Sequence, residues 1–265
     1  NAWVICCCTA VLAAFGTFFR WLQDQVCFEA ETGLAVRGSI WPYAVALVVV
    51  IAAVVLAVVC FRMKNQPHTS FPDSLPAAFA AAQRVRTIGG VVLGALLAVG
   101  GAWLMISSGT LSSPGLQRVL AVLAIVTGAA FARQMLAPGD AEATSGAVVC
   151  ASMPIVLLAF WLIVSYKVNI INPTISAYAV EILALCAALI AFYQLAGFAY
   201  GRPKAIKSIF WSQFAAFLCI TALPDDRAGA QQLMLAAIAG ILVFQSYLTA
   251  SNIRPAVSGP VGGAQ

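Results

Sequence analysis

The chain contains eight continuous, mostly apolar runs of about 20 residues each, which is the length a helix needs to cross a membrane. An α-helix rises 1.5 Å per residue, so each run can span a hydrocarbon core of ~30 Å. Because the runs are continuous rather than alternating, a transmembrane β-barrel is excluded. The sequence therefore predicts an all-α, polytopic bundle of eight transmembrane helices. The expected spans are Ala2–Gln23, Ile40–Phe61, Thr87–Ser108, Gly115–Leu136, Gly146–Tyr166, Ala177–Tyr200, Ala205–Leu223 and Ala228–Ala250.

The composition agrees with a membrane protein. Hydrophobic residues make up 62% of the 265 residues, whereas soluble domains contain about 45–50%. No soluble fold of this length has enough interior to bury so much apolar surface. We expect one transmembrane domain over residues 1–250, followed by a flexible, Gly- and Pro-rich cytoplasmic tail over residues 251–265.

Basic residues in the connections predict the orientation of the bundle, because Lys and Arg are enriched in cytoplasmic loops. Five of the 14 basic residues fall on the side that we assign as outer: Arg20, Arg37, Arg118, Lys167 and Arg227. The other nine fall on the opposite side. The sequence therefore predicts that both termini lie in the cytoplasm.

Glu181 is the most informative single residue, because it lies within the sixth apolar run, near its outer end. Ionisable side chains inside a membrane are costly and mark functional sites by default. Glu181 is therefore a candidate to bind an ion or a polar ligand. The structural alternative is that it reaches the headgroup region or forms an ion pair with Arg20, Arg118 or Lys167 at the same level.

Polar residues of the last three runs have two interpretations. Gln194, Ser212 and Gln213 could line a polar path, or they could form interhelical hydrogen bonds worth about 0.6 kcal/mol each. Under the first interpretation the candidate ligand- or ion-binding set is Glu181, Gln213, Ser212, Gln194, Arg20 and Arg118.

The longest outer connection, residues 24–39, carries much of the charge of the chain. Gly33 at its middle favours a short hairpin-like loop. Such a loop could be a docking element for a partner, or it could simply connect two helices. The candidate docking residues are Asp24, Phe28, Glu29, Glu31 and Arg37.

Several kinds of chemistry are not supported by the sequence. The single histidine, His68, excludes a bis-His haem and a His-rich zinc site. The consecutive cysteines Cys6, Cys7 and Cys8 point about 100° apart on a helix and cannot converge on one ion. We find no catalytic constellation, and we expect no metal and no cofactor. The expected partners are the lipid bilayer and an unknown small molecule or protein, with no nucleic acid.

The segment around the outer loop carries a resemblance. RWLQ, followed by FEAETGLAVRGS, resembles a segment of uncharacterised multi-pass membrane proteins of anaerobic Firmicutes. The resemblance covers residues 1–45 and implies a location in the bacterial cytoplasmic membrane. It implies no activity, cofactor or catalytic residue.

Two functional hypotheses follow. The protein could be a small-molecule transporter or channel-like protein with a polar site near the outer end of the sixth helix. Alternatively, it could be a non-catalytic sensor, scaffold or accessory subunit that binds a partner through the outer loop. A polar cavity beside Glu181 that reaches Gln213 favours transport, whereas a solid bundle with only a surface cap favours the second hypothesis.

Overall fold

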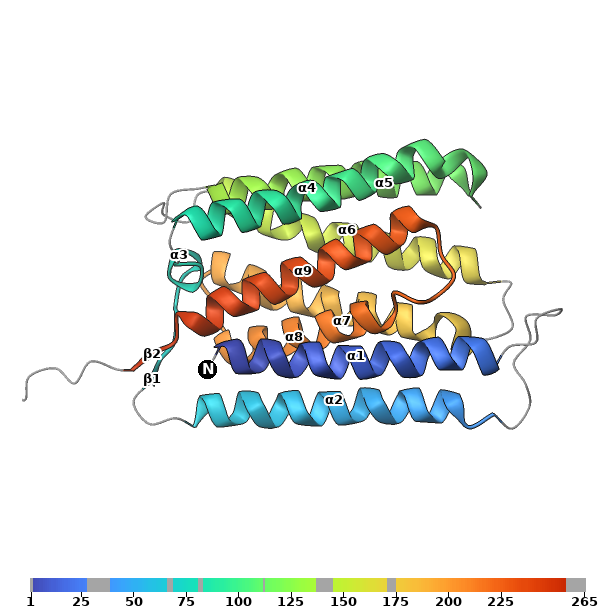
Figure 1. Cartoon of the computed structure of the whole chain (residues 1–265). Helices are drawn as coiled ribbons and strands as arrows, with labels where there is room; N and C mark the ends of the chain where they lie inside the picture. Colours follow the sequence, from blue (N-terminus) through green and yellow to red (C-terminus); the bar gives the residue numbers. More distant parts are fainter. Residues whose placement is uncertain are drawn as a thin grey trace, which may run out of the picture.

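The computed structural model describes residues 2–27, 39–65, 69–80, 83–111, 113–136, 145–170 and 175–255. Long helices run side by side over these ranges (Figure 1). They are α1 (Ala2–Val26), α2 (Trp41–Lys64), α4 (Gln83–Ser107), α5 (Pro114–Leu136), α6 (Ser145–Asn169), α7 (Ile175–Ala199), α8 (Ala205–Thr221) and α9 (Gly229–Ser251). The short elements are α3 (Leu75–Ala78), the 3₁₀ turn η1 (Ser108–Thr110), and the two-residue strands β1 (Thr69–Ser70) and β2 (Arg254–Pro255).

Each predicted span falls on one of the long helices, so the all-helical, multi-pass architecture is confirmed. Within the described residues, seven helices are long and apolar enough to cross a membrane. The seventh predicted span, Ala205–Leu223, falls on α8, which is a shorter apolar helix of 17 residues. The first residue of α1 and the last residues of α9 lie at the same end of the bundle, which we call the terminal end (Figure 1). We call the opposite end the pocket end.

The backbones of α4 and α5 approach each other closely at two glycines, where any larger residue would collide with the facing helix. A Cβ placed on Gly94 would lie 2.5 Å from the carbonyl oxygen of Gly128. Conversely, a Cβ on Gly128 would collide with the carbonyl oxygen of Gly94. Small residues allow this backbone approach, which is a general way to pack helices where lipid removes the hydrophobic driving force. The α4–α5 pair forms one side of the bundle.

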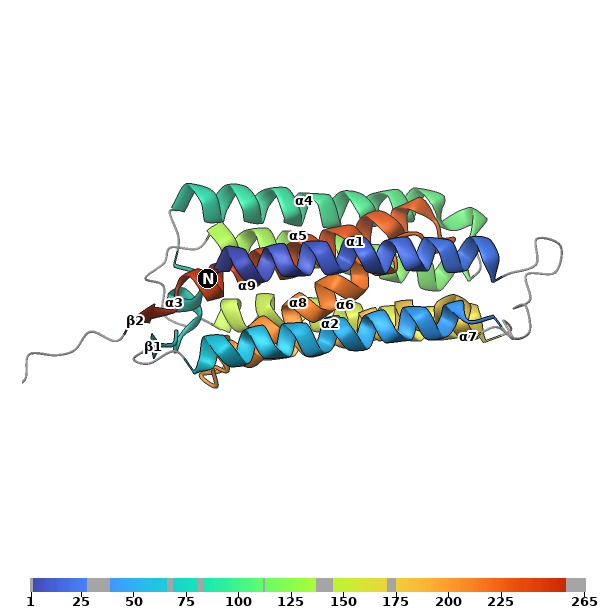
Figure 2. The same ribbon diagram turned by 60° about the horizontal axis from the view of Figure 1, so that its bottom comes forward.

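Helix α8 lies inside the bundle and α2 lies at its edge. Eleven of the 17 residues of α8 are buried, against five of the 24 residues of α2. α8 packs against α1, α2, α7 and α9, and α9 in turn packs against α4. α2 and α4 consequently occupy opposite sides of the bundle in both views (Figures 1 and 2).

The terminal end is fastened by a few backbone contacts. β1 and β2 pair in antiparallel fashion, with Ser70 opposite Arg254. Asn252 donates a hydrogen bond from Nδ2 to the carbonyl oxygen of Ala78, at 2.9 Å. The start of the predicted flexible tail, up to Pro255, is thus paired with the connection before α4. The rest of that tail, residues 256–265, lies outside the described residues.

The predicted outer loop is only partly described. α1 continues to Val26, so Asp24 lies on a helix rather than in a loop. At the other end of the loop, Ser39 lies 2.8 Å from the Cys27 sulfur and forms a hydrogen bond with it. The hairpin predicted around Gly33 lies outside the described residues.

We expect Gly94→Ala to lower the stability of the protein. The added methyl group must displace the α5 backbone at Gly128, and overpacking of this kind costs about 1–3 kcal/mol. The measurement is the thermal midpoint of unfolding in detergent micelles. Gly109→Ala is the matched control, because a Cβ there meets nothing within 4 Å. Equal midpoints for both variants would contradict the close α4–α5 contact.

Candidate functional site

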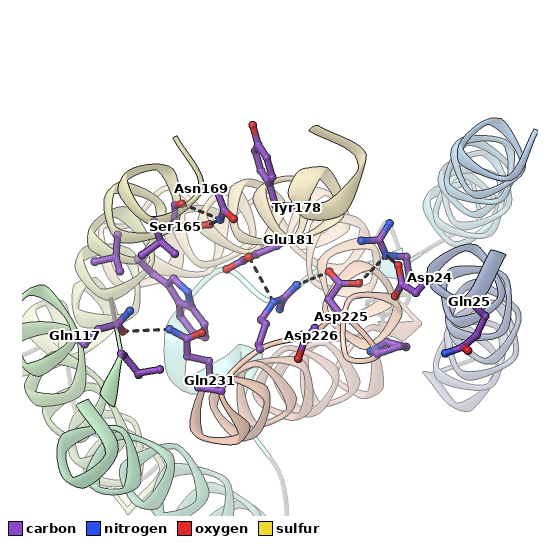
Figure 3. A pocket seen from close by; sticks show the side chains of 18 residues that line it. Asp24, Gln25, Gln117, Ser165, Asn169, Tyr178, Glu181, Asp225, Asp226 and Gln231 are labelled. Carbon is purple, nitrogen blue, oxygen red and sulfur yellow. Dashed lines mark hydrogen bonds and ion pairs between the residues drawn. The ribbon is translucent and has the colours of Figure 1, made fainter. Parts of the chain in front are cut away.

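A polar pocket of about 670 Å³ opens at the pocket end of the bundle. Its wall comes from α1, α5, α6, α7 and α9, together with the α8–α9 turn (residues 222–228). The polar and charged lining residues are Arg20, Asp24, Gln25, Gln117, Ser165, Asn169, Tyr178, Glu181, Asp225, Asp226, Arg227 and Gln231. Most of them are labelled in Figure 3.

Arg227, in the α8–α9 turn, joins two carboxylates in the wall of this pocket. Its Nε lies 3.4 Å from Oε2 of Glu181, and its Nη2 donates to Oδ2 of Asp225 at 2.5 Å. The side chains of Arg227, Glu181 and Asp225 are 7%, 9% and 6% exposed. Figure 3 shows Glu181 and Asp225 on either side of the dashed contacts to this guanidinium. The intramembrane carboxylate of α7 is therefore neutralised from the turn that connects α8 and α9.

The ion-pair network continues from Asp225 to α1. Arg20 donates from Nε to Oδ1 of Asp225 at 2.6 Å, although its side chain is only 1% exposed. The same guanidinium donates to Oε1 of Gln23 at 3.0 Å and lies 3.8 Å from Oδ1 of Asp24. Three segments far apart in the chain are thus connected by one line of alternating charges.

The α8–α9 turn is fixed by a side chain of α9. Gln232 donates from Nε2 to the carbonyl oxygens of Leu223, at 3.3 Å, and Asp225, at 3.2 Å. Pro224 lies between these two residues and cannot donate a backbone hydrogen bond. The amide of Gln232 therefore adds to the backbone hydrogen bonds of the turn, in which Leu223 and Asp225 donate to Ile220 and Ala222. It fixes the backbone of Asp225 against the start of α9.

Uncharged polar groups form another part of the wall. Gln231 donates to Oε1 of Gln117 at 3.1 Å, which connects α9 to α5. Asn169 donates to the backbone oxygen of Ser165 at 2.9 Å, and both residues line the pocket. In Figure 3, Gln117 and Gln231 lie apart from the charged network, whereas Ser165 and Asn169 lie beside Glu181. The pocket therefore presents both charged and neutral hydrogen-bonding groups.

The pocket has an excess of negative charge. Four acidic residues (Asp24, Glu181, Asp225 and Asp226) face two basic residues (Arg20 and Arg227), which leaves a formal charge of −2. Carboxylates alone do not make a metal site here. Within the described ranges, no three His, Cys, Asp or Glu residues are grouped so that they could hold a metal ion.

The structure brings together only part of the set predicted from sequence. Glu181 and Arg20 line the same pocket, but each pairs with a residue of the α8–α9 turn rather than with the other. Arg118 is exposed and donates to the Ser108 hydroxyl at 3.3 Å. Lys167 is also exposed.

The residues predicted to line a polar path, Gln194, Ser212 and Gln213, lie away from this pocket. Gln213 donates to the Ser246 hydroxyl and, at 3.4 Å, to the Cys6 sulfur. Its neighbour Ser212 is fully buried. Neither residue lines the pocket around Glu181. Gln194 lies 13 residues beyond Glu181 on α7, a distance of about 20 Å along the helix.

Of the residues predicted for docking in the outer loop, Asp24 lines the pocket. Phe28, Glu29, Glu31 and Arg37 lie outside the described residues.

Sequence reasoning missed Asp225, Asp226 and Arg227 as site residues, because it used Arg227 only to predict the orientation of the bundle. The signal that could have identified them is Pro-Asp-Asp-Arg between two apolar runs. This turn lies at the same predicted membrane level as Glu181, and a buried carboxylate needs a cationic partner.

We expect Arg227→Met to destabilise the protein strongly. It leaves the buried carboxylate of Glu181 without its cation, and breaking a buried ion pair costs about 3–5 kcal/mol. The measurement is chemical unfolding in detergent. Arg118→Met is the matched control, because Arg118 is exposed and contacts the Ser108 hydroxyl. The double variant Arg227→Met/Glu181→Gln should recover part of the loss. An equal loss of stability in Arg227→Met and Arg118→Met would contradict the claim that the buried ion pairs stabilise the protein.

Comparison with known proteins provides no functional assignment: no protein family, curated protein or solved structure matches this chain. The chemistry of the pocket is therefore the basis on which a function can be argued.

Proposed function

We propose that the protein is a small-molecule transporter of the bacterial cytoplasmic membrane, and that its solute site is the pocket around Glu181 and Arg227. The observation that carries this proposal is a polar, charged pocket of about 670 Å³ between the ends of apolar helices. Ligand sites in proteins typically occupy about 300–1,000 Å³. Ionisable residues within membrane-spanning helices characteristically line substrate and ion pathways.

The proposal includes eight crossings with both termini in the cytoplasm. The 17 residues of α8 reach about 25 Å, which is less than a full hydrocarbon core of ~30 Å. A helix surrounded by protein does not need to be as long as the hydrocarbon core is thick. The backbone N–H and C=O groups at its ends can form hydrogen bonds with polar groups of the bundle. The excess of basic residues at the terminal end supports the orientation. Under this orientation the pocket opens to the cell exterior.

The bacterial membrane location rests on the resemblance of residues 1–45 to membrane proteins of Firmicutes. Uptake would require that the solute pass from the pocket toward the terminal end, and export would require the reverse. The group around Gln213 and Ser246 lies along this direction, eight residues before the end of α8, or about 12 Å of helix.

A second function, a non-catalytic sensor, is favoured by the packing beneath the pocket. Leu185 of α7, Leu218 of α8 and Leu235 of α9 are each fully buried. Gln213 is also not among the residues that line the pocket around Glu181. A pocket that does not reach Gln213 favours the second hypothesis over transport. In a sensor, the same solute would bind at the pocket end and would not cross this apolar layer.

A ligand-stabilisation screen on the purified protein tests whether the pocket binds a solute. The probes are amino acids, short peptides, amines, sugars and nucleosides. A bound solute raises the thermal midpoint by mass action. We expect a stabilising solute to lose its effect on Ala228→Trp, because Ala228 lines the pocket and the indole would fill it. The matched control is Ala102→Trp, since Ala102 is exposed on α4 and lies outside the pocket lining. A solute that stabilises Ala228→Trp as much as the wild type does not bind there.

Transport is then separated from sensing with the stabilising solute in labelled form. Proteoliposomes that contain wild-type protein or Ala102→Trp should accumulate it, and those that contain Ala228→Trp should not. Binding without accumulation by the wild type would contradict transport and support the sensor.

A further inference from the structure

A long apolar cleft of about 460 Å³ lies between α1 and α9, with the end of α8 at its base. Its described lining residues are Trp3, Cys6, Ile220, Leu223, Ala236, Ala239, Gly240, Val243, Phe244 and Tyr247, and none of them lines the solute pocket. We propose that this cleft binds one acyl chain of a phospholipid from the leaflet at the terminal end. The inference does not depend on the proposed transport of a solute.

The cleft arises because α1 and α9 are in contact at one end and diverge toward the other. At the terminal end Trp3 and Tyr247 pack with their ring centroids 5.1 Å apart. Toward the pocket end α1 packs on α8, where Thr17 donates to the carbonyl oxygen of Ile220 at 3.2 Å. Figure 1 shows the ribbons of α1 and α9 separating in this direction, with α8 visible between them. The side chains of Ile220 and Leu223 at the base of the cleft are consequently only partly covered.

The polar groups of the cleft are confined to one end. Among its described lining residues, only Trp3 and Tyr247 carry an N–H or O–H group, and both lie at the terminal end. A water molecule needs two to four polar partners, so the rest of the cleft does not suit water. Indole and phenol groups are enriched where a membrane meets water. The cleft therefore matches a molecule with its polar group near Trp3 and a hydrocarbon tail directed toward Leu223.

The length of the cleft matches one leaflet of a bilayer. Along α9 the cleft extends from Tyr247 to Ala236, an advance of eleven residues or about 16 Å of helix. One leaflet supplies half of a hydrocarbon core of ~30 Å. The tail of a phospholipid at the terminal end can therefore follow the cleft as far as Leu223 and Ala236.

The width of the cleft favours a hydrocarbon chain over a helix of another protein. A volume of about 460 Å³ along about 16 Å of helix corresponds to a mean width of about 5 Å. Carbon atoms in van der Waals contact lie about 3.5–4.0 Å apart, so a single acyl chain fits this width. A helix with its side chains is at least about 10 Å wide and does not enter. Such a chain contacts α1, α8 and α9 together, and its binding stabilises their arrangement by mass action.

The direct test counts the phospholipids on the purified protein by native mass spectrometry. The protein is stripped of lipid in detergent and is then mixed with dioleoylphosphatidylcholine. We expect the wild type to keep one phospholipid at collision energies that remove the lipids bound elsewhere on its surface. Absence of a retained lipid on the wild type would overturn the inference.

Two variants place the retained lipid in the cleft. Ala236 and Val243 line the cleft and are partly exposed, so Ala236→Phe fills its inner end and Val243→Trp fills its middle. Each should lower the retained fraction at least tenfold. The matched control is Ala57→Phe, because Ala57 is exposed on α2 and does not line the cleft. Retention by either folded cleft variant equal to that of Ala57→Phe would overturn the inference.

Chain length gives a second measurement, which needs only the wild type. Dihexanoylphosphatidylcholine has the same headgroup, but the five C–C bonds of each six-carbon chain span less than about 8 Å. This is about half the length of the cleft, so we expect the retained fraction to be at least tenfold lower than with dioleoylphosphatidylcholine. Equal retention would mean that the headgroup alone holds the lipid, and it would overturn the inference. A dimer of the chain that Ala236→Phe disrupts would also overturn it, because the cleft would then be an interface between two copies.

Discussion

The contact between Arg227 and the two carboxylates Glu181 and Asp225 determines how the pocket end of the bundle is held together. A carboxylate within an apolar helix is costly unless a cation neutralises it. The cation comes from a turn, and a second cation, Arg20, connects the same turn to α1. Three contacts therefore join α7, the α8–α9 turn and α1 at the pocket end, in addition to the apolar packing between the helices.

Below this level the structure depends on close apolar packing. Gly94 and Gly128 allow two backbones to touch, and α8 buries most of its residues among its neighbours. Dispersion contacts and small residues supply the stability of such a bundle, because lipid tails compete with side chains for apolar contact. The charged network and the apolar interior therefore perform separate tasks. The first shapes a binding surface, and the second keeps the helices in position around it.

The fold was more predictable from the sequence than the site. The length of each apolar run can be counted in the sequence and indicates a membrane-spanning helix. Every predicted span coincides with a helix. The partner of Glu181 could not be found in the same way, because periodicity does not reveal how each helix is rotated against the others. Arg118 and Lys167 lie at a suitable level but are exposed. The α1 boundary also mattered: three further residues of helix placed Asp24 in the wall of the pocket rather than in a loop. The role of Arg227 as the partner of Glu181 follows only from their contact in the folded protein.

The short length of α8 has a consequence for the way this bundle meets bilayers of different thickness. Its 17 residues lie against protein on several sides, whereas α2 has a largely exposed surface along 24 residues. Hydrophobic mismatch acts on lipid-facing helices, which respond by tilting or by deforming the bilayer. The peripheral helices therefore absorb a change in thickness, and α8 is insulated from it. Because α8 carries the turn with Asp225 and Arg227, this part of the pocket wall depends less directly on bilayer thickness than the part that the more exposed α1 contributes.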